Sequence, residues 1–122
     1  MKKILLLIDD DPDIVELTKF ILEDADFLVH SAGTAEEGLI ILEKDHPDLI
    51  LLDLYLPKMQ GWELSTQLKR DNAYKNIPII IFTANAGINK KTVKEMGGDD
   101  FIIKPYEYDD LLEKVKVNLA GQ

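Results

Sequence analysis

The chain contains no cysteine, so neither disulfide bonds nor thiolate metal ligands can hold its fold together. It also lacks low-complexity segments, Gly/Ser-rich linkers and internal repeats, and no apolar stretch approaches the ~20 residues needed to cross a bilayer. The apolar run after Met1-Lys2-Lys3 is short and leads directly into three aspartates, which argues against a signal peptide. These absences predict a soluble, cytoplasmic protein without membrane association.

Basic residues are too few to balance the acidic ones. The chain has 14 Lys and Arg against 23 Asp and Glu, which gives a formal net charge of −9. A field of that sign repels phosphate groups, so the composition argues against direct nucleic-acid binding and against binding to anionic membranes. With 122 residues, 46% of them hydrophobic, residues 1–122 have the length and composition of one globular domain.

Short apolar runs alternate with amphipathic stretches from end to end. The expected strands are 3–8, 27–29, 49–53, 78–82 and 100–103, and the expected helices are 12–25, 34–44, 62–69, 89–96 and 108–119. Asp11 is expected to cap the first helix, with Pro12 at its first position. Fivefold β/α alternation predicts an α/β fold: a doubly wound (βα)5 three-layer sandwich whose parallel sheet has the order 2-1-3-4-5.

Helical spacing also predicts which face of the first helix is buried. The expected stripe consists of Ile14, Val15, Leu17, Thr18, Ile21 and Leu22.

Polar side chains stand where four of the expected strands end. Asp9 and Asp10 follow the first strand, Asp53 closes the third, Thr83 follows the fourth, and Lys104 follows the fifth. In open parallel sheets, ligands and chemistry gather outside the carboxyl ends of the strands. We therefore expect these five side chains to meet in one cleft.

Three converging carboxylates, those of Asp9, Asp10 and Asp53, would repel one another unless a hard cation neutralised them. Mg²⁺ fits best, because it accepts few protein oxygens and favours sites that also hold a phosphoryl group. Composition alone leaves a second interpretation open, an acidic helix N-terminus stabilised by the macrodipole. An EF-hand calcium loop is excluded, because Ile14 and Phe20 occupy its glycine and glutamate positions.

Lys104 and Thr83 also have ordinary interpretations. Most lysines are solvated, but Lys104 follows a buried strand and precedes a proline, so its ammonium is placed to meet a phosphate oxygen. The Thr83 hydroxyl either bonds nearby backbone or points into the same cleft.

Over essentially its whole length, the chain resembles the CheY-like receiver domains of two-component response regulators. Five motifs in the matching order carry the resemblance: Asp9-Asp10, Asp53, Leu56-Pro57 with Gly61, Thr83-Ala84, and Lys104-Pro105. Each motif is weak alone, but together they stand at the ends of the expected strands.

The resemblance implies a role for each cleft residue. Asp53 would be the phosphoacceptor, and Mg²⁺ would be held by Asp10, Asp53, the backbone carbonyl of Tyr55 and, through water, Asp9. Lys104 would bond the phosphoryl group.

The resemblance further implies that the Lys104–Pro105 bond is cis and that Thr83 and Phe101 form a switch pair. Tyr55 and Asn85 would flank the pocket and set the access of hydrolytic water.

Two positions depart from the commonest family pattern. Leu56 stands where methionine is usual and Tyr106 where phenylalanine is usual, and neither is expected to touch the chemistry.

The predicted function is transfer of a phosphoryl group from a sensor histidine kinase or histidine phosphotransfer protein to Asp53. The chain would catalyse only its own phosphorylation and dephosphorylation, so we do not expect an enzyme. One alternative is a small aspartyl-phosphate phosphohydrolase, which needs a second acid and a lid for which the chain has no room. The second alternative is a degenerate receiver that acts only as a protein-binding module. The presence of the full set of cleft residues, Asp10, Asp53, Thr83 and Lys104, argues against it.

The predicted output is a change in protein binding on the face formed by 89–96, 100–103 and 108–119. Three lysines in 89–96, together with Gly98-Asp99-Asp100, would allow a phosphorylation-dependent homodimer. Gly98-Asp99-Asp100-Phe101 also resembles the corresponding segment of receivers attached to winged-helix DNA-binding domains. The terminal Gly-Gln has no linker composition, which favours a stand-alone receiver over an excised domain.

Overall fold

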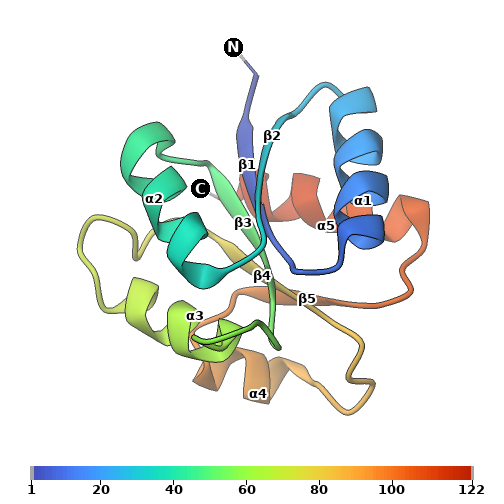
Figure 1. The fold of residues 1–122 in the computed structure, drawn as a ribbon. Helices are drawn as coiled ribbons and strands as arrows, with labels where there is room; N and C mark the ends of the chain where they lie inside the picture. The colour runs from blue at the N-terminus through green and yellow to red at the C-terminus, as the bar shows by residue number, and fades with distance from the viewer. Residues whose placement is uncertain (1, 122) are drawn as a thin grey trace.

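The computed structural model describes residues 2–121, in which strands and helices alternate throughout (Figure 1). In chain order the elements are β1 (Ile4–Ile8), α1 (Pro12–Asp24), β2 (Leu28–Ala32), α2 (Ala35–Asp45), β3 (Leu49–Asp53), α3 (Gly61–Lys69), β4 (Ile79–Thr83), α4 (Lys90–Glu95), β5 (Asp100–Ile103) and α5 (Tyr108–Ala120). The strands form one parallel sheet in the order β2-β1-β3-β4-β5. The predicted fold class and strand order are confirmed.

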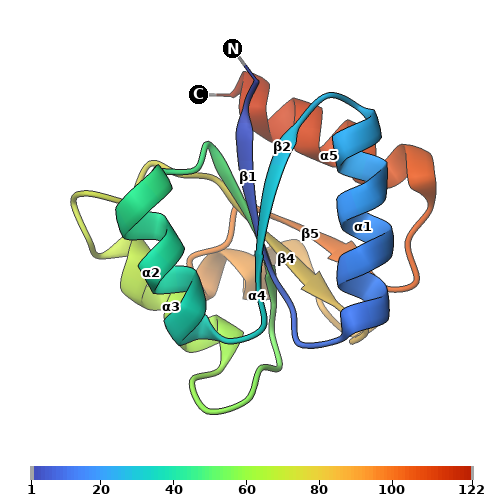
Figure 2. The ribbon, with the colours of Figure 1, turned by 45° about the horizontal axis from the view of Figure 1, so that its top comes forward.

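Helices cover both faces of the sheet. Figure 2 shows α1 and α5 on one side and α2, α3 and α4 on the other. Each helix layer packs its apolar side chains against alternate residues of the strands, so the core consists of two clusters separated by the sheet. Strands β3 and β4 are buried along their whole length, which explains why their sequences are continuous apolar runs without alternation.

Helix α1 begins as predicted and differs on one point of burial. The Asp11 side chain accepts a hydrogen bond from the Asp13 N–H at 3.0 Å, and Pro12 opens the first turn. Thr18, Ile21 and Leu22 are buried, but Leu17 is 52% exposed, so its assignment to the buried stripe was wrong. Successive residues of a helix are ~100° apart, and the turn that faces the sheet is centred on Thr18.

Strand β2 is longer at its carboxyl end than the sequence predicted. The expected strand 27–29 covers only its beginning, because the ladder with β1 continues through His30, Ser31 and Ala32. β2 is an edge strand, and its partly exposed His30 and Ser31 do not form an apolar run. Backbone pairing with β1 extends the strand here, a contribution that hydrophobic patterning does not detect.

Among the helices of residues 2–121, none combines the length and apolar character needed to cross a membrane.

Candidate functional site

The carboxyl ends of β1, β3, β4 and β5 carry the polar residues singled out in the sequence. Asp9 and Asp10 follow β1, whereas Asp53 and Thr83 are the last residues of β3 and β4. Lys104 follows β5, and its backbone N–H donates to the Thr83 carbonyl oxygen at 2.7 Å. The parallel direction of the strands therefore brings these residues to one edge of the sheet. Asp9, Asp10 and Asp53 lie at the switch point between β1 and β3.

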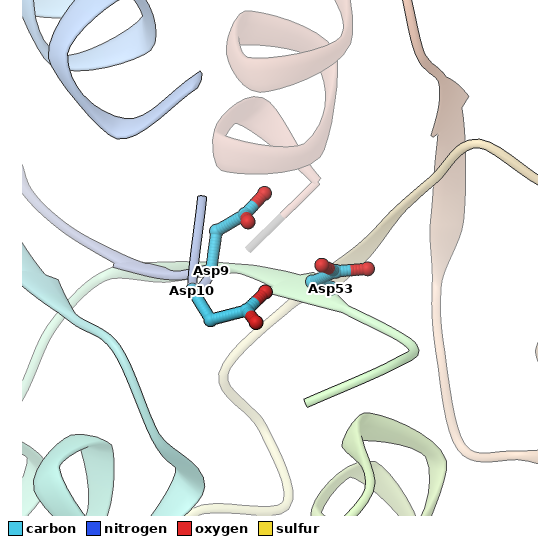
Figure 3. A group of neighbouring side chains, drawn as sticks. All are labelled: Asp9, Asp10 and Asp53. Carbon is cyan, nitrogen blue, oxygen red and sulfur yellow. The ribbon is translucent and has the colours of Figure 1, made fainter. Parts of the chain in front are cut away.

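Three carboxylates meet at this edge. One oxygen from each of Asp9, Asp10 and Asp53 can be chosen so that all three lie within 4.8 Å of one another. Figure 3 shows the side chains extending from the ends of β1 and β3 beside one another. Asp9 and Asp53 are buried, whereas Asp10 is exposed. Asp11 instead caps α1, so the helix N-terminus interpretation holds for this residue.

The Lys104 ammonium bridges the two buried carboxylates. Its Nζ lies 2.5 Å from Asp9 Oδ2 and 3.3 Å from Asp53 Oδ2. When ionised, three carboxylates and one ammonium leave two negative charges uncompensated. A set of oxygen donors with that charge fits a hard divalent cation, so these residues could hold one.

The protonation of Asp53 reflects its burial. Desolvation raises the pKa of this carboxyl to about 6, and the neighbouring Asp9 carboxylate adds to the rise. The charge of Lys104 and hydrogen bonds from Lys104 and the Tyr55 N–H act in the opposite direction.

The residues expected to flank the cleft contact one another. The Thr83 hydroxyl is fully buried and accepts a hydrogen bond from the Asn85 N–H at 3.1 Å. Asn85 Nδ2 lies 3.5 Å from the hydroxyl oxygen of the exposed Tyr55, so the two side chains meet beside the pocket.

Phe101 pairs with Ile81 and therefore lies on the same face of the sheet as Thr83. The peptide bond between Lys104 and Pro105 is cis.

Sequence reasoning missed an interaction that holds Phe101. Lys114 Nζ, on α5, lies 4.9 Å from the Phe101 ring centroid and donates to the Phe101 carbonyl oxygen at 2.9 Å. The same ammonium donates to Asp100 Oδ1 at 2.8 Å, and Asn118 donates to the other oxygen of Asp100. Burial alone would raise the pKa of Asp100, but these hydrogen bonds and one from the Phe101 N–H hold it below its usual value. No local sequence signal marks this cluster, because the residues of β5 and α5 that form it are 13 to 18 positions apart in the chain.

Gly61 allows the loop after β3 to pack close to the acceptor strand. Its N–H donates to the Leu54 carbonyl oxygen at 2.8 Å, and a Cβ here would lie 1.8 Å from the Asp53 carbonyl oxygen. Backbone cannot yield as a flexible side chain can, so the loop must move if residue 61 has a side chain.

Gly61→Ala is therefore expected to lower the free energy of unfolding by about 3 kcal/mol or more, near the upper end of overpacking effects. Denaturant unfolding measures the change. Gly33→Ala is the matched control, because a Cβ at Gly33 meets nothing within 4 Å. Equal midpoints for the two variants would contradict the close approach.

A comparison with protein families identifies one that covers most of the chain. Residues 5–116 match the family model described as the response regulator receiver domain. Two curated relatives are the DNA-binding dual master transcriptional regulator RpaA of Synechocystis, 36% identical over 116 residues, and the phosphate regulon transcriptional regulatory protein PhoB of Pseudomonas aeruginosa, 37% identical over 118 residues. The alignments cover 94% and 96% of this chain but 48% and 52% of those proteins. The chain thus spans about half the length of the curated relatives it matches.

Solved structures of similar size have the same fold. A putative response regulator from Chloroflexus aurantiacus superposes with a TM-score of 0.93 at 32% identity, covering 98% of this chain and 99% of that one. A CheY-like response regulator receiver domain protein from Methanospirillum hungatei gives a TM-score of 0.90 at 35% identity, covering 99% and 96%. With the matching family model and an acidic cleft at the expected edge of the sheet, the chain belongs to the response regulator receiver domain family, the phosphoacceptor modules of two-component signalling.

Proposed function

We propose that Asp53 accepts a phosphoryl group from a phosphohistidine on a sensor histidine kinase or histidine phosphotransfer protein. The observation that carries this proposal is the convergence of Asp9, Asp10 and Asp53 around the Lys104 ammonium. Family membership supports the reaction class, and the local geometry supports the choice of acceptor.

In the proposed transfer, an Asp53 carboxylate oxygen attacks phosphorus in line with the departing imidazole nitrogen. The new O–P bond forms as the N–P bond breaks, and the imidazole leaves with the bonding electron pair. Lys104 already lies 3.3 Å from Asp53 Oδ2, so it can donate to a phosphoryl oxygen with little movement. Positioning and electrostatic stabilisation account for most of the catalysis in such reactions.

Mg²⁺ is the proposed cofactor, with Asp10, Asp53 and the Tyr55 carbonyl as direct ligands and Asp9 as a ligand through water. When bound, it would supply charge neutralisation to the transferring oxygens. The chain's own contribution is to hold two buried carboxylates and one exposed carboxylate close together.

The acyl phosphate on Asp53 would be lost by attack of water. Tyr55 and Asn85 meet beside the cleft and would limit the approach of that water. The same contact would therefore influence the lifetime of the signal.

The phosphoryl group would also draw in the Thr83 hydroxyl, which now accepts a hydrogen bond from the Asn85 N–H. That movement would make room for Phe101 to turn inward. Phe101 must leave the Lys114 ammonium above its ring, an interaction of about 0.5–1 kcal/mol at partly exposed sites. A phosphoryl group that favours the inward state by a few kcal/mol would be sufficient.

Chemical-shift mapping with beryllofluoride, which occupies the phosphoryl position, tests the proposed switch. We expect perturbations in the presence of Mg²⁺ to extend from the cleft to Phe101 and α4. Lys114→Met should move the ligand-free spectrum partway towards the beryllofluoride spectrum, with a two- to fivefold population change. Perturbations confined to the cleft, with Phe101 and α4 unchanged, would refute the switch.

The output partner is proposed to bind the α4–β5–α5 face. The names of RpaA and PhoB describe transcriptional regulation, and both proteins are about twice as long as this chain. The present chain, with its charge of −9, is not expected to contact DNA itself.

A phosphorylation-dependent homodimer on this face stays a prediction. Asp99 and Asp100 are already paired within the chain, with Lys69 and Lys114 respectively. Dimerisation through these carboxylates would require the lysines of two protomers to share or exchange them.

A further inference from the structure

A side-chain hydrogen bond links α1 to the segment that follows β5. Thr18 Oγ1 lies 2.9 Å from the Tyr106 hydroxyl oxygen, although the two residues are 88 positions apart. Thr18 is fully buried, so its hydroxyl has no access to bulk water. Burial raises the pKa of Tyr106, which keeps the phenol protonated and able to donate. The bond therefore fixes the place of Tyr106 relative to the α1 layer.

The Tyr106 ring continues this contact towards the cleft. It lies 5.5 Å from the Phe82 ring, measured between centroids, at an interplanar angle of 40°. Phe82 is fully buried, and Lys104 Nζ lies 4.9 Å from its ring centroid. An unbroken series of contacts thus leads to the ammonium in the cleft, through Thr18, Tyr106, Phe82 and Lys104.

The position of the Lys104 ammonium between Asp9 and Asp53 affects the proposed phosphoryl transfer. In the structure it is nearer to Asp9, at 2.5 Å, than to Asp53, at 3.3 Å. During transfer it must serve a phosphoryl group attached at Asp53, so any displacement that increases its distance from Asp53 would remove it from the reacting oxygens. Rates of positioned reactions respond steeply to such displacements.

Tyr106 is well placed to limit this displacement. It follows Lys104 by two residues, with only Pro105 between them, and its ring supports the aromatic surface beneath the ammonium. Of the contacts in this series, the hydroxyl pair can be removed with little change in side-chain volume.

We propose that Tyr106, anchored by Thr18, is a positioning residue that holds the Lys104 ammonium close to Asp53 for phosphoryl transfer. This inference rests on the proposed function. It revises the expectation from the sequence that the tyrosine at position 106 has no bearing on the chemistry.

The test compares initial rates of phosphorylation by acetyl phosphate at saturating Mg²⁺, followed by intact-mass analysis. Tyr106→Phe and Thr18→Val are each expected to slow phosphorylation about fivefold, a moderate loss of positioning. The double variant should be no slower than either single variant, because both remove the same contact. Thr18→Ser keeps the hydroxyl and should restore the rate to within twofold of wild type.

Tyr108→Phe is the matched control, since it removes a phenol from an exposed site two residues along the chain. Its rate should equal that of wild type. A second readout is the ¹H–¹⁵N signal of the Lys104 ammonium, which should shift in Tyr106→Phe and remain unchanged in Tyr108→Phe. A purely structural role for the hydrogen bond would change the melting temperature without moving either readout.

The possible failures are distinguishable. If wild type takes up no phosphoryl group, the proposed function and this inference fall together. If wild type is phosphorylated and Tyr106→Phe reacts at the same rate, only the positioning role is overturned. The role of Thr18 as anchor is overturned if Tyr106→Phe is slow while Thr18→Val reacts like wild type.

Discussion

Asp53→Asn is expected to abolish phosphorylation of the chain by acetyl phosphate. Wild type should gain the mass of one phosphoryl group in the presence of Mg²⁺, because Asp53 is a buried carboxylate beside a bridging ammonium and two further carboxylates. The asparagine amide is nearly isosteric with the carboxylate but has no anionic oxygen to attack phosphorus. Intact-mass analysis measures the adduct directly.

The matched control for this experiment is Asp26→Asn. Asp26 is exposed and has a φ of 74°, a backbone conformation that asparagine tolerates as well as aspartate. This variant should accept a phosphoryl group as wild type does. An adduct of undiminished yield in Asp53→Asn would show that another side chain is the acceptor.

Mg²⁺ is expected to stabilise the native state through the same three carboxylates. They converge only in the folded chain, where Lys104 offsets a single charge, so the ion should bind the native state in preference to the unfolded one. At a free concentration ~100 times its dissociation constant, such a ligand adds about 2.7 kcal/mol to the free energy of unfolding. Thermal or denaturant unfolding in Mg²⁺ and in chelator measures the difference.

Asp10→Ala should remove this stabilisation. Asp10 is the exposed member of the group, so its loss is not expected to disturb the core in the absence of Mg²⁺. Asp24→Ala, which removes an exposed carboxylate at the far end of α1, should keep the full response. If wild type unfolds identically in Mg²⁺ and in chelator, the carboxylates do not form a metal site.

Local patterns predicted most of the architecture because the strongest signals in this chain are local. The run Leu49–Leu52 is buried on both faces, so it could be recognised without knowledge of its partners. Asp11 and Pro12 mark the start of α1 through contacts within the first turn. The prediction of the edge strand β2 was less complete, because His30 and Ser31 belong to the strand through backbone pairing with β1 rather than through an apolar pattern.

The candidate cleft was predictable for a related reason. Parallel strands place their carboxyl ends at one edge, so polar residues that close buried runs must gather there. Asp9, Asp53 and Lys104 are separated by 44 or more positions along the chain, yet each follows or ends a strand of the same sheet.

The sequence by itself therefore determined the alternation of elements, the sheet order and the set of residues at the cleft, since each depends on periodicity, turn chemistry or strand direction. Only the tertiary structure decided which side chains touch across the layers. It brought Tyr106 to Thr18, placed Lys114 over Phe101 and left Leu17 exposed. These contacts depend on the packing of helices against the sheet, which joins residues distant in the chain and leaves no regular spacing in the sequence.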